Sequence, residues 1–290
     1  MKINKPIPFK IPKSDNHALW VQVDDGSYFY PQLHYHPEFQ LTAIVKGEGI
    51  FYAGNNMTSF EEGDVLITGP NIPHLLKNSE LYWGEESPGV KGVLLFFDEY
   101  SFGNQFFDLK EMRQLKAFLK DCNRVFKAEG EFKKQIFQKI ITCTTLKNET
   151  LVINFLEILS LLNKSDKYFL NNEQYRLILN ENEGDRLNKV LEYTFQNYAQ
   201  DIMIEDVAKI AFLSRSQFSY FFKLHTGKTY IQFLNDLRIE NACILLKNTK
   251  HTIEQICYEV GFKNVSNFVR QFKKSKACTP SVYRKSWINF

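Results

Sequence analysis

The stretch Gly261–Lys276, GFKNVSNFVRQFKKSK, combines regularly spaced phenylalanines with a cluster of cations. On a helical wheel of about 100° per residue, Phe268 and Phe272 fall on one face, and Arg270 and Lys273 fall on the other. An apolar face of this kind is buried against neighbouring helices, and a cationic face is left for a partner. The stretch therefore predicts a folded helix that presents charge, not a loose basic tail.

A second copy of this pattern lies earlier in the chain. The stretch IEDVAKIAFLSRSQFSYFFKLHTGKT from residue 204 matches IEQICYEVGFKNVSNFVRQFKKSKACT from residue 253. After one inserted residue, Phe218 and Phe222 take the places of Phe268 and Phe272. Each copy predicts a short helix, a tight turn and a second helix, which is the helix-turn-helix layout. Ser214 precedes the second helix of the first copy as its predicted N-cap.

The outward faces of the two second helices carry the donors and cations that reading of a DNA major groove requires. Arg270 suits bidentate bonding to a guanine, and Val269 suits contact with a thymine methyl group. Lys223 and Lys273 suit phosphate contacts. A generic helical repeat with solvated polar faces is the alternative. The candidate DNA-contacting residues are Arg215, Ser216, Ser219, Tyr220, Lys223, Asn264 (also a predicted N-cap), Ser266, Asn267, Val269, Arg270 and Lys273.

The charge distribution separates the C-terminal part from the rest of the chain. Residues 185–290 hold 16 Lys and Arg against 9 Asp and Glu, whereas the preceding residues hold 20 against 24. This asymmetry indicates a C-terminal part that meets a polyanion. The five cysteines include no C-x-x-C pair, which favours a reducing compartment over a disulfide framework. We expect neither a secretory signal nor a membrane span, and a cytoplasmic location.

The first 105 residues predict a β-sandwich or β-barrel, because short apolar runs such as FQLTAIV and VKGVLLFF alternate with turn signals. Residues 106–170 predict a helical segment, in which Leu151, Phe155, Ile158, Leu159 and Leu162 form one stripe. That stripe either packs on the barrel or forms a subunit interface. The polar residues 171–184 predict a linker, and residues 185–290 predict the helical domain.

The stretch from Gly261 to Arg284, GFKNVSNFVRQFKKSKACTPSVYR, resembles the signature of AraC-type transcription regulators. The resemblance implies two helix-turn-helix units joined by a long helix, here about Tyr230–Leu246, with both recognition helices in successive major grooves. The family usually has Gly where Ala277 stands and Pro where Tyr230 stands. The chain departs from the family pattern at those two positions.

Two stretches of the β region, HYHPEFQ (34–40) and GDVLITGPNIPHLLKN (63–78), resemble the two cupin motifs. Metal-dependent cupins bind a divalent ion with such histidines and an acid. Here Glu38 comes too early for the acid and the neutral Gln40 lies near its place, so we assign no metal ligand and no cofactor. AraC-type regulators often use such a barrel as a sensor. The candidate effector-binding residues are His34, His36, Glu38, Gln40, His74 and Trp83.

Together these patterns predict an α+β multidomain protein: a cupin-like, jelly-roll β-barrel with following helices, then an all-α domain with two helix-turn-helix units. The resemblance implies a ligand-responsive transcription regulator, without enzymatic activity, whose small-molecule effector is not identified, with sugars among the candidates. Its expected partners are double-stranded DNA, the effector, RNA polymerase and a second copy of the chain, with no membrane. The alternatives are a metal-dependent cupin enzyme fused to a DNA-binding domain and an effector-independent DNA-binding protein.

Overall fold

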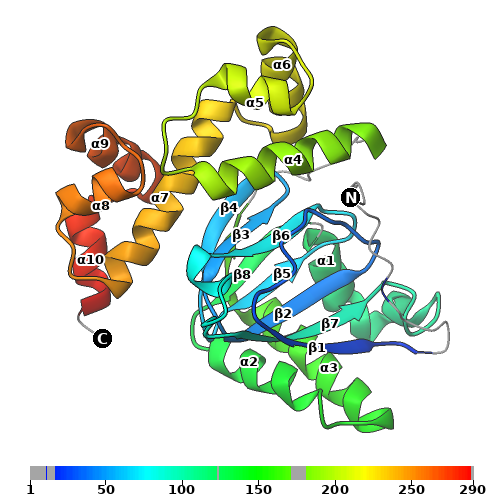
Figure 1. Ribbon diagram of the computed structural model, residues 1–290. Coiled ribbons are helices and arrows are strands. Elements are labelled where there is room, and N and C mark those ends of the chain that lie inside the picture. Colours follow the sequence, from blue (N-terminus) through cyan, green and yellow to red (C-terminus); the bar gives the residue numbers. More distant parts are fainter. Residues whose placement is uncertain (1–10, 12–16, 123, 171–180, 289–290) are drawn as a thin grey trace. The chain divides into compact units, whose positions relative to one another are not determined.

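The computed structural model of the 290-residue chain describes residues 11, 17–122, 124–170 and 181–288. The chain divides into two compact units, made in the main of residues 17–170 and 181–288. The first unit combines strands with helices, and the second is entirely helical in its described elements (Figure 1). In the part of the chain that the structure describes, no helix has the length and apolar character needed to cross a membrane.

Two antiparallel sheets form the N-terminal unit. The larger sheet has the strand order β1-β7-β2-β5-β8-β9, and the smaller has the order β4-β3-β6. This arrangement confirms the predicted cupin-like jelly-roll fold. The strands are β1 (Trp20–Gly26), β2 (Phe39–Lys46), β3 (Gly49–Ala53), β4 (Asn56–Phe60), β5 (Val65–Thr68), β6 (His74–Asn78), β7 (Val90–Phe97), β8 (Val125–Glu129) and β9 (Asp166–Phe169).

Strand β2 shows why the larger sheet is buried on both faces. Its side chains alternate between the two faces. Leu41 and Ala43 join the core beneath helices α1 (Arg113–Asp121), α2 (Lys133–Thr142) and α3 (Asn148–Lys164). Ile44 joins a second core that also contains side chains of β3 and β6. Helices therefore cover one face of the larger sheet, and the smaller sheet covers the other.

The segment 106–170, predicted as helical, contributes strands β8 and β9 to the larger sheet as well as helices α1 to α3. The β fold therefore extends beyond residue 105. Strand β8 pairs with β5, and β9 pairs with β8. Each of these strands is only four or five residues long, so sequence periodicity around them is dominated by the longer helices.

The leucine-rich stripe of helix α3 packs on the chain's own sheet. Phe155, Ile158, Leu159 and Leu162 are each 0% exposed and belong to the core beneath β2 and β7. Leu151 packs against the same core. Of the two interpretations of this stripe, packing on the barrel is the one found, and the subunit interface is wrong for these side chains. Dimerisation through another surface stays a prediction.

Seven helices of the C-terminal unit are described, and α7 connects its two helix-turn-helix units (Figure 1). Residues 171–180 of the predicted linker lie outside the described residues. The last four residues of that linker belong to α4. The helices are α4 (Glu181–Asn197), α5 (Ile204–Ile210), α6 (Arg215–Thr226), α7 (Tyr230–Asn248), α8 (Ile253–Glu259), α9 (Val265–Lys276) and α10 (Pro280–Ile288).

Candidate functional site

Helices α6 and α9 begin at the two predicted N-caps. The Ser214 hydroxyl accepts the backbone N–H of Gln217 at 3.4 Å, and the Gln217 side chain accepts the Ser214 backbone N–H at 3.0 Å. The Asn264 side chain accepts the backbone N–H of Asn267 at 2.8 Å. Both predictions are confirmed. The amide oxygen of Asn264 is therefore already used to cap α9.

The inward faces of α6 and α9 are also confirmed. Phe218, Phe222, Phe268 and Phe272 are each 0% exposed. In the first unit the two rings pack edge-on against Tyr230, and in the second Phe272 packs against a tyrosine of α10. Most of the candidate DNA-contacting residues are exposed, namely Arg215, Ser216, Ser219, Tyr220, Lys223, Asn264, Ser266, Arg270 and Lys273, whereas Asn267 and Val269 are partly buried.

The outward face of α6 is polar and partly pre-arranged. Arg215 Nη1 lies 2.8 Å from Glu205 Oε1 in an exposed ion pair. The Ser219 hydroxyl donates to the backbone oxygen of Arg215 at 2.9 Å. Tyr220 is 72% exposed, and Lys223 makes no ion pair with any described residue. This face offers a hydroxyl-bearing ring and a cation for an external partner.

The outward face of α9 is narrower than the helical wheel predicts. Val269 packs against the core of the second unit, together with Val265. The reason is that α9 contacts α7, α8 and α10, so its buried arc is wider than packing against a single partner would require. Arg270 stays exposed, and its Nη2 donates to Asn267 Oδ1 at 2.9 Å. Contact of Val269 with a thymine methyl group stays a prediction. The packing of Val269 against the core disfavours it.

Three histidines converge in the N-terminal unit. His34 and His36 precede β2, and His74 begins β6. Their ligand-capable atoms all lie within 4.8 Å of one another. A two-way backbone bridge joins His34 to His74, with N···O distances of 3.1 and 2.8 Å. The sequence prediction brought these three residues together correctly, and the bridge explains how the irregular segment before β2 is held in place.

The tautomer of each ring in this cluster follows from its backbone contact. Each Nδ1 atom faces a backbone carbonyl, which only accepts hydrogen bonds, so each Nδ1 carries the proton. The N···O distances are 2.9 Å for His34, 3.1 Å for His36 and 2.8 Å for His74. Burial lowers the pKa of His34 to about 4 and holds the pKa of His74 well below its usual value. In a neutral ring of this tautomer, Nε2 holds the lone pair.

Gln40 connects two of these lone pairs. Its side-chain amide lies 3.0 Å from His36 Nε2 and 3.2 Å from His74 Nε2, and it also bonds the Thr42 hydroxyl at 2.8 Å. Amide orientation follows from the hydrogen-bond pattern. In the structure the amide oxygen Oε1 faces both rings and the NH₂ group donates to Thr42. A 180° rotation of the amide would turn the NH₂ group toward the two Nε2 lone pairs and let the oxygen accept from Thr42. Gln40 therefore links His36, His74 and Thr42 in one polar network.

The convergent imidazoles fit the donor set of a divalent transition metal. His34, His36 and His74 would hold such an ion through Nε2, because hydrogen bonds from Nδ1–H to carbonyls orient ligating rings in this way. A bound ion would supply Lewis acidity there. Gln40 is a weaker neutral fourth ligand. The expectation of no metal cofactor stays a prediction.

The cavity beside this cluster is small. It encloses about 50 Å³ and is lined by His34, Gln40 and His74. Pockets for organic ligands usually enclose roughly 300–1,000 Å³, so a sugar ring does not fit in this arrangement. Trp83 does not approach the cluster: its ring is 40% exposed and stacks on Tyr28 at a centroid distance of 4.1 Å. The loop that follows β6 carries Trp83 to the surface.

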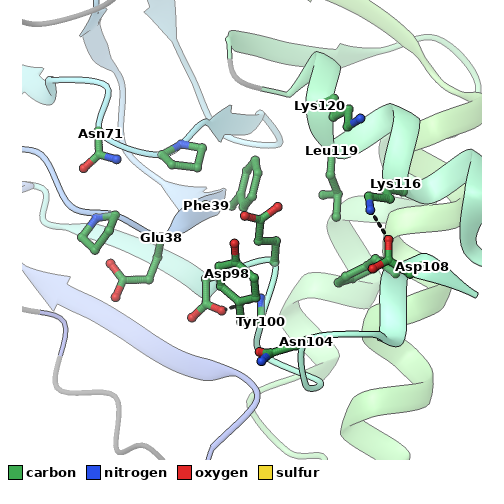
Figure 2. Close-up of a pocket in the computed structure, with 14 residues that line it drawn as sticks. Glu38, Phe39, Asn71, Asp98, Tyr100, Asn104, Asp108, Lys116, Leu119 and Lys120 are labelled. Atoms are coloured by element: carbon green, nitrogen blue, oxygen red, sulfur yellow. Dashed lines mark hydrogen bonds and ion pairs between the residues drawn. The ribbon is translucent and has the colours of Figure 1, made fainter.

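Glu38 also departs from the predicted arrangement. Pro37 interrupts the strand, so the alternation that would align Glu38 with the histidines and Gln40 begins only at Phe39. The Glu38 side chain instead lines a separate pocket of about 620 Å³ between the start of β2 and helix α1 (Figure 2). No sequence pattern predicted this pocket. Its one visible signal was the acidic pair Asp98–Glu99 directly after the apolar β7.

Comparison with known proteins connects the two units to known families. The AraC-like ligand binding domain family matches residues 22–82, and a helix-turn-helix domain family matches residues 207–286. The HTH-type transcriptional regulator YdeC of Bacillus subtilis (strain 168) is 25% identical over 279 residues, covering 88% of this chain and 87% of that protein. The crystal structure of the DNA-binding domain of AdpA with a target DNA is 22% identical and covers 36% of this chain and 94% of that one, with a TM-score of 0.35.

A further relative matches only the C-terminal part. An HTH-type transcriptional regulator of Haemophilus influenzae is 36% identical over 101 residues, which is 35% of this chain and 34% of that protein. This chain thus spans about a third of that relative but most of the Bacillus protein. With the cupin-like sheets, the duplicated helix-turn-helix units and both family matches in agreement, the chain combines an AraC-like ligand-binding domain with an AraC-type helix-turn-helix domain.

Proposed function

We propose that this regulator binds double-stranded DNA through α6 and α9 and that a small molecule held by the N-terminal unit modulates this binding. The observation that carries the proposal is the duplication. Two helices with equivalent buried phenylalanines present exposed polar and cationic faces at equivalent positions. Insertion into successive major grooves, about 34 Å apart on one side of the duplex, requires such a repeated face.

The remaining partners complete this proposal. We expect RNA polymerase and a second copy of the chain as protein partners, a cytoplasmic location and no enzymatic activity. The described cysteines are all free, which suits a reducing compartment. Effector and DNA affinities are coupled reciprocally, so an effector that strengthens DNA binding is itself bound more tightly by the DNA complex.

Fluorescence anisotropy with a labelled fragment from the region upstream of the chain's own gene tests DNA binding. We expect an affinity that falls steeply between about 50 and 200 mM salt, because bound cations release counterions from the phosphates. The double variant Lys223→Ala/Lys273→Ala should lower the salt slope. Lys110→Ala, an exposed lysine of the N-terminal unit, is the matched control. Absence of salt-sensitive binding to any fragment contradicts the proposal.

A second candidate, a metal-dependent activity in the barrel, is favoured by the three convergent imidazoles. Metal analysis of the purified protein separates it from the first. Stoichiometric zinc, nickel, manganese or iron that is lost in a His74→Ala variant supports this candidate. Sub-stoichiometric metal in a folded protein that still binds DNA excludes it.

A further inference from the structure

The larger pocket of the N-terminal unit has the size of an organic-ligand site. It encloses about 620 Å³, against about 50 Å³ beside the histidine cluster. Ligand pockets usually enclose roughly 300–1,000 Å³. The pocket is lined by Glu38 and Phe39 at the start of β2, by Asp98 and Tyr100 after β7, and by Leu119 of α1 (Figure 2).

The walls of this pocket are acidic. Four carboxylates line it, against two lysines: Glu38, Asp98, Glu99 and Asp108, with Lys116 and Lys120. Lys116 is paired with Asp108, as the dashed line in Figure 2 marks, so these two charges offset one another. The three remaining carboxylates outnumber Lys120. Such a wall attracts cations and repels anionic ligands.

Two of the three remaining carboxylates already have hydrogen-bond donors. Asp98 Oδ1 accepts the backbone N–H of Tyr100 at 2.8 Å, and Glu99 bonds the Tyr100 hydroxyl. Glu38 is different. Its Oε2 atom is enclosed by the protein and accepts no hydrogen bond from any described residue, although the side chain is only 16% exposed.

The nearest basic atom does not satisfy Glu38. His36 Nδ1 lies 3.5 Å from Glu38 Oε2 but only 3.1 Å from the Glu38 backbone oxygen, which receives its hydrogen. An enclosed carboxylate oxygen without a donor carries a desolvation penalty. Because Oε2 itself is enclosed, a ligand cation would meet the Glu38 carboxylate at its other oxygen and would stabilise the charge that the two oxygens share. The pocket therefore lacks a cation beside Glu38.

The pocket lining also has an apolar part, which we call its floor. The buried side chains of Phe39, Phe107 and Leu119 line the same space. We propose that the pocket binds a small organic amine in its ammonium form, with the ammonium group donating to Glu38 and Asp98 and the carbon skeleton lying over this floor. A neutral sugar would leave the Glu38 charge uncompensated, and a carboxylate ligand would meet repulsion. The amine's regulatory effect rests on the proposed function, whereas its binding does not.

Isothermal titration calorimetry on the full chain tests the ligand class. The probes are 1-butylamine, 1,4-diaminobutane and 2-phenylethylamine, with 1-butanol and butyrate as neutral and anionic matches and with Ca²⁺ and Mg²⁺ as inorganic cations. We expect at least one amine to bind, and its affinity to exceed that of 1-butanol and butyrate by at least about tenfold, because the ammonium group completes a charge-assisted bond. Equal binding of 1-butanol or butyrate, binding of the metal ions alone, or no amine binding overturns the proposal.

Variants locate the site. Glu38→Gln and Asp98→Asn should each weaken amine binding by at least about tenfold, because each removes a charge that faces the ammonium group. Asp25→Asn is the matched control, since Asp25 pairs with Lys91 on an exposed surface outside the pocket. Unchanged thermal unfolding midpoints show that the variants fold. If Glu38→Gln and Asp98→Asn both fold and bind amine like Asp25→Asn, the assigned pocket is wrong.

A DNA-binding measurement with and without the bound amine separates the two proposals. A change in DNA affinity supports the amine as the effector. Amine binding without any such change overturns its regulatory role and leaves the binding site in place. Loss of all DNA binding would instead contradict the proposed function while the calorimetry still stands.

Discussion

The two helix-turn-helix units share one scaffold and differ in what they present. Both bury a pair of phenylalanines at 0% exposure at equivalent positions of α6 and α9. Their outward faces have diverged: Tyr220 of α6 occupies the place of Arg270 in α9. A close-packed core tolerates little change in the size or shape of its side chains. An outward side chain is constrained mainly by the partner that it contacts. If both units enter the major groove as proposed, we therefore expect them to contact different base pairs through the same fold.

The tight turns of the two units differ for a steric reason. Gly261 has a φ of +89°, and a Cβ there would lie 2.6 Å from the Ala199 backbone oxygen. The equivalent residue of the first unit is Phe212, with a φ of +54° and a side chain that is 78% exposed. The second turn needs glycine because another segment packs against it. The first turn is open, so it accepts a side chain at the cost of local strain.

The largest expected effect is on the second turn. Gly261→Ala should lower the free energy of unfolding by about 2–4 kcal/mol, because strain at positive φ adds to a backbone clash. Urea denaturation followed by circular dichroism measures the loss. Gly84→Ala is the control, since a Cβ at Gly84 meets no atom within 4 Å. Phe212→Gly should act in the opposite direction; equal losses for Gly261→Ala and Gly84→Ala would remove the distinction between the turns.

The next effect concerns the outward faces. Arg270→Ala and Tyr220→Ala should each weaken DNA binding by about 1–3 kcal/mol and relax sequence preference in different parts of the operator. Competition assays with single-base operator variants measure this. Lys110→Ala again serves as the control. Uniform weakening on every sequence by Arg270→Ala would show that this side chain meets phosphate and that α9 is oriented differently from our proposal.

A smaller effect is expected at the ends of α6 and α9. Gly227 and Ala277 end these helices in the left-handed conformation, with φ of +70° and +59°. Ala277 thus keeps the geometry of the glycine that the family usually has there. Ala277→Gly should raise stability, and Gly227→Ala should lower it, by about 1 kcal/mol each. Thermal unfolding of both variants measures these changes. Shifts of the unfolding midpoint in the same direction for both variants would contradict the prediction.

The smallest expected effect is on the salt dependence of DNA binding, and it should be the same for both units. Lys223 and Lys273 occupy equivalent exposed positions. Either substitution to alanine should reduce the slope of log affinity against log salt by about 0.9, the value for one lost phosphate contact. Anisotropy titrations over a range of salt concentrations measure the slope. A change at only one of the two positions would mean that only one recognition helix follows the DNA backbone.

Much of the fold and of the candidate interface could be predicted from the sequence. The repeat and the helical period located α6 and α9, their caps and their buried phenylalanines, because these properties depend on neighbours a few residues apart. The short strands β8 and β9 were missed, because four or five residues carry little periodic signal. The stripe of α3 had two readings, because amphipathicity does not identify the covering surface.

The sequence by itself determined the duplicated helix-turn-helix units, the cupin-like pattern and the pairing of His34 and His36 with the later His74. Tertiary structure alone decided which groups meet across long separations. It placed Glu38 in a pocket shared with α1, on the Nδ1 side of His36 and outside the group of convergent ligand atoms, and it left Trp83 on the surface. It also widened the buried arc of α9 to include Val269. The physical reason is that local patterns fix periodicity and capping, whereas enclosure of a side chain depends on segments that are distant in the chain.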